Sequence, residues 1–287
     1  MSGLEADHAA CAAILQRSGS SFALPIALLP AAKRRGTTAL YAFCRLADDL
    51  VDEAADPVSA AEALASFTTA TDEALAGAWV AEPVLRAVAD TVRRYAVPPD
   101  CLRDVLAGVR MDLERREYET PAELELYCSR VASAVGIASI HVWGFTDPAA
   151  LATAHDCGVA FQLTNILRDV PEDLARGRVY LPRADFAACG CSPDDLIAGR
   201  IGREFAALAA LEVERATARF HAAAALDRML STDGRLVFRA MFGVYRSLLA
   251  AVRRAGPAIF TARVRPAKPR LLASAATSLA FGTGWRR

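Results

Sequence analysis

Two short stretches of the chain carry rows of oxygen-bearing side chains at helical spacing. In the segment 162–173 the row consists of Gln162, Asn165, Asp169 and Asp173. Residues three or four apart share one face of an α-helix, so these side chains line one edge beside an apolar stripe. Oxygen atoms are the ligands that Mg²⁺ prefers, and the ion completes its shell with water and substrate phosphate. The row therefore indicates a metal site, with a solvated acidic helix edge as the alternative.

A second row occupies the segment 41–52. Its members are Tyr41, Arg45, Asp48, Asp49 and Asp52. Asp48 and Asp52 are one helical turn apart, as are Asp169 and Asp173, and like charges at that spacing repel by roughly 0.2–0.5 kcal/mol per pair. Two helices that each carry this penalty indicate that something positive neutralises both. If the rows face each other, they enclose a site for several Mg²⁺ ions and a diphosphate.

The composition of the 287 residues points to a helical protein that binds neither nucleic acid nor zinc. Hydrophobic residues make up 54% of the chain, and the excess of Ala and Leu over β-branched runs favours helices. The 33 basic and 33 acidic residues balance, whereas a general nucleic-acid binder carries a basic excess. The four histidines have no ligand-like spacing, and the seven cysteines include no Cys-x-x-Cys pair. We therefore expect reduced thiols in a cytoplasmic protein.

No segment of the sequence has the pattern of a transmembrane span or a signal peptide. The longest candidate, 271–285, contains Ser, Thr and Gly and is shorter than the roughly 18 to 20 apolar residues that a span needs. Glu5 and Asp7 stand where a signal peptide has a basic start. We therefore expect a cytoplasmic protein without a transmembrane span.

Apolar periodicity, interrupted by Pro, Gly and Ser, predicts a series of helices. The expected helices cover about 4–16, a stretch from 33 through the first acidic row, 57–77, 83–95, 121–145, 203–230 and 234–255, with short helices near 193 and at the C-terminus. Pro171 lies inside the second row, and we expect that helix to kink or end near Val170 because proline removes a hydrogen bond and clashes with the preceding turn. No linker divides the chain, so we expect one all-α domain, 1–287, built around a central cavity.

Several flanking segments could contribute to the site, and each has an ordinary structural alternative. Ser18-Gly19-Ser20-Ser21-Phe22 offers donors to a phosphate or forms a helix-capping loop. Asp112 belongs to a segment typical of a salt-bridged exposed face, with a place in the site as the alternative. The small residues of 127–136 allow close helix packing or a slot for an apolar chain. Arg176-Gly177-Arg178 is a loop whose two guanidiniums suit bidentate phosphate contacts.

These stretches resemble the squalene and phytoene synthases, the head-to-head prenyl transferases. The main matching blocks are LYAFCRLADDLVDE at 40–53 and QLTNILRDVPED at 162–173, followed by GRVYLP at 177–182. Ser20-Ser21-Phe22, the block 127–136 and Tyr245-Arg246 support the match. The blocks span nearly the whole chain in family order. Pro171, and Gly36-Thr37-Thr38 where relatives often carry larger residues, depart from the pattern without removing a ligand.

The resemblance implies an isoprenoid-synthase-type helical bundle around a central apolar cavity, in which two prenyl diphosphates bind through Mg²⁺. The metal ligands that it implies are Asp48, Asp49, Asp52, Asn165, Asp169 and Asp173. The substrate contacts that it implies are Ser18, Ser21, Tyr41, Arg45, Gln162, Arg168, Arg178 and Tyr180. Four of these aspartates, Asp48, Asp52, Asp169 and Asp173, also take catalytic roles by resemblance. So does Tyr245, which is a candidate for the base together with released diphosphate.

Within the family, the block 127–136 is more similar to the bacterial presqualene diphosphate synthases of hopanoid pathways. Phytoene synthases usually carry Gly where this chain has Ser133. We therefore expect Mg²⁺-dependent condensation of two farnesyl diphosphates to presqualene diphosphate, with a peripheral membrane contact for product release. The alternatives are phytoene or dehydrosqualene synthesis, NADPH-dependent squalene synthesis and a non-catalytic scaffold role. A scaffold would have no need for both acidic pairs and the arginines.

Overall fold

The computed structural model describes residues 3–20, 22–114 and 117–284, and most of these residues are helical. The helices are α1 (Gly3–Arg17), α2 (Ala23–Ala27), α3 (Ala31–Asp52), α4 (Pro57–Leu75), α5 (Pro83–Tyr95), α6 (Pro99–Glu114), α7 (Pro121–Cys128), the π-helix η1 (Ser129–Ser133), α8 (Ala134–Trp143), α9 (Ala150–Ala175), α10 (Arg183–Cys189), α11 (Pro193–Ile197), α12 (Glu204–Ala223), α13 (Leu226–Met229), α14 (Thr232–Ala255), the 3₁₀-helix η2 (Gly256–Phe260) and α15 (Lys268–Phe281). Two isolated β-bridges are the only β pairing among the described residues. The all-α prediction is confirmed.

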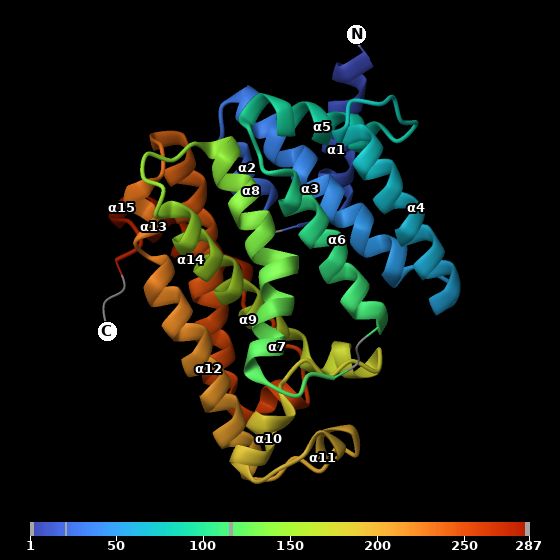
Figure 1. Cartoon of the computed structure of the whole chain (residues 1–287). Helices are drawn as coiled ribbons and strands as arrows, with labels where there is room; N and C mark the ends of the chain where they lie inside the picture. The colour runs from blue at the N-terminus through green and yellow to red at the C-terminus, as the bar shows by residue number, and fades with distance from the viewer. Residues whose placement is uncertain (1–2, 21, 115–116, 285–287) are drawn as a thin grey trace.

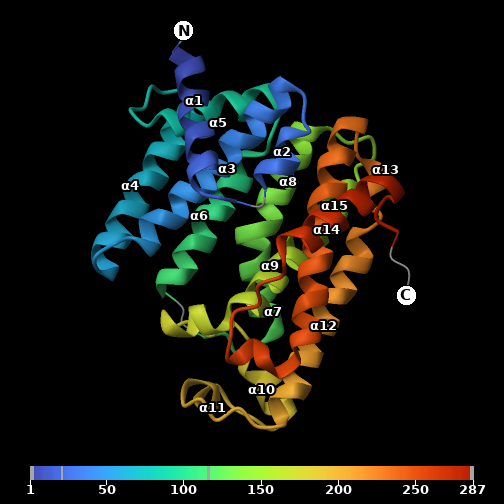
Figure 2. The ribbon, with the colours of Figure 1, turned by 180° about the vertical axis from the view of Figure 1, so that it is seen from behind.

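Helices α8 and α9 run through the middle of the molecule (Figure 1). Helices α3 to α6 lie on one side of them and α12, α14 and α15 on the other, and the view from behind agrees (Figure 2). The closest packing joins α3 to α1 and α5, α9 to α8 and α12, and α14 to α15. The buried apolar side chains form one continuous core that extends from Cys11 in α1 to Phe260 in η2. The two helices that carry the acidic rows, α3 and α9, are therefore held in place by the same core.

Several helices begin at a proline that follows a capping side chain, as the sequence predicts. Asp56 accepts hydrogen bonds from the backbone N–H groups of Val58 and Ser59 at the start of α4. Glu82 and Thr120 cap α5 and α7 in the same way. Proline at the first helical position loses no helical hydrogen bond there, and the capping oxygen satisfies an N–H group that the helix leaves unpaired.

The sequence predicts that this helix kinks or ends near Val170; α9 instead passes through Pro171 and ends at Ala175, so an end near Val170 is excluded. Proline cannot donate to the carbonyl of the residue four before it, which leaves the carbonyl of Leu167 without its helical partner. The coil that joins η2 to α15 crosses α9 at this point, and the N–H of Val264 donates to the carbonyl of Arg168 at 3.2 Å. Tertiary hydrogen bonding next to the proline therefore lets the helix continue through the second acidic row.

The predicted helix 121–145 is divided by a π-helical turn, η1, between α7 and α8. The predicted helix 203–230 also divides, into α12 and α13. A further short helix, α10, was not predicted. π-Helical turns are frequent at functional sites. Here η1 lies at the point where the chain passes between α6 and α9, both of which contact it.

Gly158 explains how α9 and η1 come so close. A Cβ atom on Gly158 would lie 2.4 Å from the Cα atom of Ser133 and 2.5 Å from its backbone nitrogen. The Ser133 hydroxyl donates to the carbonyl of His155, one turn earlier on α9, at 2.7 Å. Glycine in α9 and a small residue in η1 therefore set the separation of the two helices. Close packing, one of the two alternatives for the small residues of 127–136, accounts for Ser133.

No helix in the three described ranges is long and apolar enough to cross a bilayer.

Replacing Gly158 by Ala is expected to lower the free energy of unfolding by about 1–3 kcal/mol, the usual range for overpacking. The new methyl group would meet backbone atoms of η1, and these cannot move aside without separating η1 from α9. Urea denaturation measures the change. Gly3→Ala is a control, because no atom lies within 4 Å of a Cβ at that position. Equal stability of the two variants would contradict the close-contact explanation.

Candidate active site

A cavity of about 620 Å³ lies between α3, η1, α8, α9 and α14. Its wall is mainly apolar and includes Leu40, Val131, Phe238 and Met241. Polar side chains gather where α3 and α9 contribute their acidic rows, and Asp48 projects into the cavity there. The cavity thus combines an acidic end with an apolar interior, as the sequence led us to expect.

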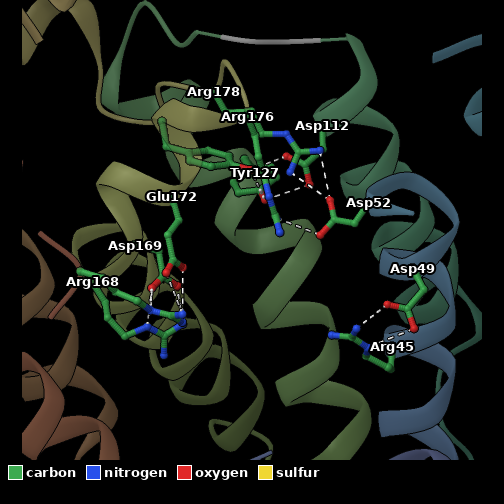
Figure 3. Close-up of polar contacts among 12 residues, drawn as sticks. Arg45, Asp49, Asp52, Asp112, Tyr127, Arg168, Asp169, Glu172, Arg176 and Arg178 are labelled. Atoms are coloured by element: carbon green, nitrogen blue, oxygen red, sulfur yellow. Dashed lines mark hydrogen bonds and ion pairs between the residues drawn. The ribbon is translucent and has the colours of Figure 1, made fainter. Parts of the chain in front are cut away.

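The first acidic row divides into two parts on α3. Asp48 lines the cavity and remains accessible to water in it. Asp49 does not line the cavity, and its carboxylate is bonded to Arg45 of the same helix at 2.6 Å. Figure 3 shows the Arg45–Asp49 pair apart from the other ion pairs of the site. Asp48 therefore faces the cavity, whereas the metal role expected of Asp49 has no support from its position. Asp52 does not line the cavity either.

Asp52, at the end of α3, is bonded to the loop that follows α9 (Figure 3). Its carboxylate accepts from Arg176 at 3.0 Å and from Arg178 at 3.3 Å. Both arginines come from the loop predicted to contact phosphate. These ion pairs connect the first acidic row to the segment directly after the second row, so the two rows do face each other.

Asp169 of α9 is bonded to two arginines that lie far apart in the sequence. Arg168, its neighbour, donates from Nε at 2.8 Å, and Arg263 donates from Nε to the same carboxylate at 2.8 Å. Arg263 also pairs with Glu172, one turn from Arg168. It belongs to the coil between η2 and α15, and its side chain lines the cavity. The sequence analysis did not identify Arg263, because no spacing signal links it to the acidic rows.

Asp112 of α6 also lies in the site, and the exposed-face interpretation of its segment is wrong at this position. Its carboxylate accepts hydrogen bonds from Tyr180 at 2.7 Å and from Tyr127 at 3.1 Å. The two phenol rings stack with centroids 5.0 Å apart. Arg115 and Arg116, in the same segment, lie outside the described residues. Tyr180, expected to contact substrate, thus lies deeper than the cavity wall and orients Asp112.

Three carboxylates, Asp48, Asp112 and Asp173, form no ion pair with an arginine or lysine among the described residues. Burial, together with the nearby Asp169, raises the pKa of Asp173 to about 7. Enclosure among protein atoms raises the pKa of Asp48, and so do Asp112 and Asp52. Like charges at short range disfavour ionisation, so the cluster favours an additional positive charge.

The dipole of helix α3 strengthens the preference of the carboxylate cluster for an additional positive charge. Asp48, Asp49 and Asp52 lie in the last turns of α3, where the partial charge of the helix end is negative. Carboxylates at this end cost roughly 0.3–1 kcal/mol each instead of stabilising the helix. No basic residue occupies the last turn of α3. Arg45, one turn before Asp49 on α3, pairs only with Asp49 among the described residues, so the charge that neutralises Asp48 and Asp52 comes from other elements or from a bound cation.

Tyr245 of α14 lies between two aromatic rings in the cavity wall. Its ring stacks on Phe161 with centroids 4.0 Å apart and on Phe22 at 5.8 Å. Burial raises the pKa of the Tyr245 phenol, while the nearby Arg168 and Asn165 lower it. The phenol is therefore protonated at neutral pH. Phe22, Phe161 and Tyr245 all line the cavity, as do Asn165 and Arg168 of the second acidic row's helix.

The remaining expected contacts lie along the same wall. Ser18, Tyr41, Arg45, Gln162 and Arg168 all line the cavity. The Ser18 hydroxyl donates to the carbonyl of Leu15 and accepts from the N–H of Ser20, which is the capping-loop alternative. Ser21 lies outside the described residues, so the contact expected of it stays a prediction.

The donor set of the site fits a magnesium ion, because it consists of carboxylate oxygens and an amide oxygen. The Oδ1 atom of Asn165 is buried without a hydrogen-bond partner among the described residues, while its amide group donates to Gln162 at 3.3 Å. In the part of the chain described, no group of three or more His, Cys, Asp or Glu side chains is close enough to hold an ion. Arginines hold Asp52 and Asp169 instead. The residue types suit Mg²⁺, and the arginines keep the carboxylates apart.

Ser133, the residue that favoured farnesyl diphosphate as substrate, does not line the cavity. Its side chain is buried at the crossing of η1 and α9. Its neighbours Val131 and Ala132, and Val135 and Gly136 one turn later, form the wall instead. A serine at this position therefore affects how the two helices pack. Ser133 does not contact the cavity, so it gives no direct physical reason to predict the length of the substrate tail.

Comparison with known proteins gives concordant matches. The family model described as squalene/phytoene synthase matches residues 15–271. A phytoene synthase from Arthrospira platensis is 34% identical over 266 residues, which cover 88% of this chain and 86% of that protein. A 15-cis-phytoene synthase from Synechococcus elongatus is 34% identical over 278 residues, with 92% and 89% covered.

Solved structures with the same architecture carry related names. The squalene synthase HpnC from Alicyclobacillus acidocaldarius superposes with a TM-score of 0.81 at 30% identity, covering 88% of this chain and 95% of its own. A dehydrosqualene synthase in complex with ligand superposes with a TM-score of 0.86 at 27% identity and 97% coverage of both chains. The helical bundle described above is thus that of an isoprenoid-synthase-type fold.

Replacing Arg178 by Gln is expected to lower the free energy of unfolding by about 1–3 kcal/mol, the range for hydrogen bonds to charged groups. Its guanidinium is 15% exposed and interacts with Asp52, Asp112 and Asp173. Arg176 contacts the same Asp52 but is 56% exposed, so Arg176→Gln is expected to change stability by no more than about 0.5 kcal/mol. Urea denaturation in excess chelator compares the two. Similar losses in both variants would show that burial of the arginine does not decide its effect.

Proposed function

The chain belongs to the squalene/phytoene synthase family, and we propose that it condenses two geranylgeranyl diphosphates head to head to phytoene in a Mg²⁺-dependent reaction. Membership makes it a prenyltransferase-type enzyme whose substrates are prenyl diphosphates. The product is the alternative from the sequence analysis, not the presqualene diphosphate expected first. Two relatives named as phytoene synthases, each 34% identical over most of their length, support it.

The observation that carries the proposal is the meeting of two acidic rows and several arginines at one end of an apolar cavity. Asp48 and Asn165 line that end, with Asp169 bonded to Arg168 and Arg263, which line it too. Negative carboxylates alone would repel a diphosphate. Carboxylates that hold a cation, flanked by guanidiniums, can bind one, because arginine matches phosphate oxygens in a bidentate geometry.

Each of these arginines can pair either with an aspartate of the acidic rows or with a diphosphate. Arg168, Arg178 and Arg263 are bonded to aspartates of the two rows in the structure. A diphosphate competes for the same guanidiniums, since its oxygens are also strong acceptors. Carboxylates freed in this way become available to Mg²⁺. Diphosphate and metal should therefore bind cooperatively.

The residues of the chain then have distinct roles in the condensation. Asp48, Asp52, Asn165, Asp169 and Asp173 would hold Mg²⁺, which would supply positive charge to the diphosphate. The arginines stabilise the negative charge that develops as the carbon–oxygen bond of one substrate breaks and its diphosphate leaves with the bonding electrons. The apolar wall keeps the second substrate's double bond beside the resulting allylic cation and excludes water, which would otherwise trap it.

The aromatic rings supply a second kind of stabilisation. Tyr245, Phe161 and Phe22 stack at the cavity wall next to the acidic end, and a cation is attracted to ring faces. Because burial raises the pKa of Tyr245, this phenol stays protonated and is poorly suited to act as a base. Released diphosphate, the other candidate, is therefore the proposed acceptor of the proton whose loss closes the cyclopropane ring. The cyclopropyl intermediate still carries the second diphosphate. Departure of that diphosphate with its bonding electrons, rearrangement of the ring and loss of a second proton then give phytoene.

Condensation of two farnesyl diphosphates to presqualene diphosphate is the second candidate. A specific observation favours it: the solved structures that superpose on this chain include a squalene synthase at 30% identity and a dehydrosqualene synthase at 27% identity. The same aspartates and arginines would serve either substrate. The two candidates therefore differ in the length of tail that the cavity accepts and in whether the cyclopropyl intermediate reacts further.

Replacing Asp48 or Asp169 by Ala is expected to lower kcat by at least about a hundredfold, since loss of one stabilising group at a developing charge typically costs that much. The helical fold should persist, because each substitution also relieves like-charge repulsion. Product formation in Mg²⁺ and circular dichroism measure the two effects. Asp72→Ala is the control, since Asp72 pairs with Arg103 on the surface. Normal turnover by both site variants at limiting Mg²⁺ would contradict the metal site.

Purified protein with Mg²⁺ is expected to convert geranylgeranyl diphosphate to phytoene with a kcat/KM at least tenfold above that for farnesyl diphosphate. One more five-carbon unit buries further carbons at about 0.8 kcal/mol per CH₂-sized group, provided that the cavity has room. Mass spectrometry of products, with and without NADPH, identifies the reaction. A preference for farnesyl diphosphate, with presqualene diphosphate accumulating, would establish the second candidate. Squalene formed only with NADPH would also overturn the proposal.

A further inference from the structure

Trp143, the last residue of α8, lies where the cavity ends. Its indole lines the cavity, yet the residue is only 5% exposed. Ile140 and Ser139, about one turn earlier on α8, line the same wall. Neither the motifs of the sequence nor the ion pairs of the acidic rows involve Trp143. Trp143 is therefore a large side chain at this end of the cavity to which no role has yet been assigned.

The helix geometry places Trp143 at the far end from the diphosphate site. The indole contacts Thr37 of α3, and Thr37 precedes Asp48 on the same helix by about 16 Å at 1.5 Å per residue. On α9, the cavity wall extends over a similar length, from Ala154 to Asn165. A prenyl tail that starts at the acidic rows thus reaches the indole last.

Hydrogen bonds on α3 hold the indole in this place. Its Nε1 donates to the Thr37 hydroxyl at 3.0 Å, and that hydroxyl donates to the carbonyl of Lys33 at 2.9 Å. Lys33 Nζ in turn donates to the carbonyl of Trp143 at 2.7 Å, which closes a ring of contacts. Gly234 of α14 packs against the other side, where a Cβ atom would lie 2.7 Å from that of Trp143. The indole therefore has little freedom to swing away from a longer tail.

A polar surface lies behind the indole. Lys33 pairs with Asp233 at 3.1 Å, and their side chains are 25% and 43% exposed. An apolar tail that passed Trp143 would meet this ion pair and remove water from it, which is unfavourable. The indole thus separates the apolar cavity from the charged end of the bundle.

We propose that Trp143, oriented by Thr37, forms the floor of the cavity and sets the longest prenyl tail that the enzyme accepts. The inference rests on the proposed function for the nature of the substrate. It deepens that function by assigning the length limit to a residue more than three helical turns from the acidic site. Trp143 acts by excluding longer tails, and it takes no part in the chemical steps.

The test compares tail lengths in the wild type and in W143A, W143F and T37V. Farnesyl, geranylgeranyl and geranylfarnesyl diphosphates are supplied with Mg²⁺, and kcat/KM is measured for each. W143A is expected to raise the ratio for geranylfarnesyl over geranylgeranyl diphosphate at least tenfold. W143F keeps a ring at the floor and should give a smaller change, and T37V should resemble W143F because the indole loses its acceptor.

Two further variants sharpen the test. Ser139→Leu fills the cavity one turn above the floor, so it should shift preference toward farnesyl diphosphate at least tenfold. Phe145→Ala removes a ring at the same end of the bundle that does not line the cavity, so it should leave the length preference unchanged. An active W143A enzyme with wild-type length preference would overturn the proposal. If W143A does not fold, unchanged preference in both T37V and Ser139→Leu would overturn it instead.

A binding measurement separates this inference from the proposed function. Non-hydrolysable prenyl thiolodiphosphates of the three lengths are added with Mg²⁺, and the rise in melting temperature is recorded. If the wild type forms no condensation product, the proposed function fails. A larger rise with the longest analogue in W143A than in the wild type would still support the floor. Equal rises in both proteins would contradict it.

Discussion

The structure depends on how carboxylates are neutralised where α3, α6 and α9 meet. The carboxylates are Asp48, Asp52, Asp112, Asp169 and Asp173, and only Asp52 and Asp169 are bonded to arginines among the described residues. The arginines come from α9, from the loop after it and from the coil before α15, so the ion pairs connect segments up to 126 residues apart. A site of this kind stays partly uncompensated until a cation binds. The uncompensated negative charge therefore favours the binding of a metal cation together with an anionic ligand.

The apolar cavity makes this electrostatic arrangement effective. Charge interactions are stronger where protein replaces water, and apart from its acidic end the cavity has a mainly apolar wall that includes Leu40, Phe238 and Met241. The same wall has to accept long apolar tails, which requires helices that approach closely without filling the space between them. Gly158 and Ser133 meet this requirement where α9 crosses η1, and Trp143 closes the far end. Diphosphate binding and tail binding are thus properties of one bundle.

Local periodicity made much of this predictable. The acidic rows could be identified because Asp48 and Asp52, like Asp169 and Asp173, repeat at the helical period, and helix starts such as Pro57 follow from local capping chemistry. Contacts that arise from packing could not be identified in this way. Arg263 is distant in sequence from Asp169, and Asp112 is recognisable only once Tyr127 and Tyr180 are brought to it. Ser133 was interpreted as a marker of tail length, but its role is in helix packing against Gly158, which lies across the helix crossing. The helix does not end before Pro171, and the hydrogen bond that the N–H of Val264 donates beside it comes from a distant segment that the local sequence does not reveal.

The central claim is that arginines hold the acidic rows until a diphosphate takes the arginines and Mg²⁺ takes the carboxylates. Calorimetric titration of Mg²⁺ into the purified protein, with and without saturating inorganic diphosphate, tests this most directly. The account predicts that Mg²⁺ binds at least tenfold more tightly when diphosphate is present, after correction for Mg²⁺ bound by free diphosphate, because each ligand releases the partner of the other. Equal affinity for Mg²⁺ in the two titrations would contradict it.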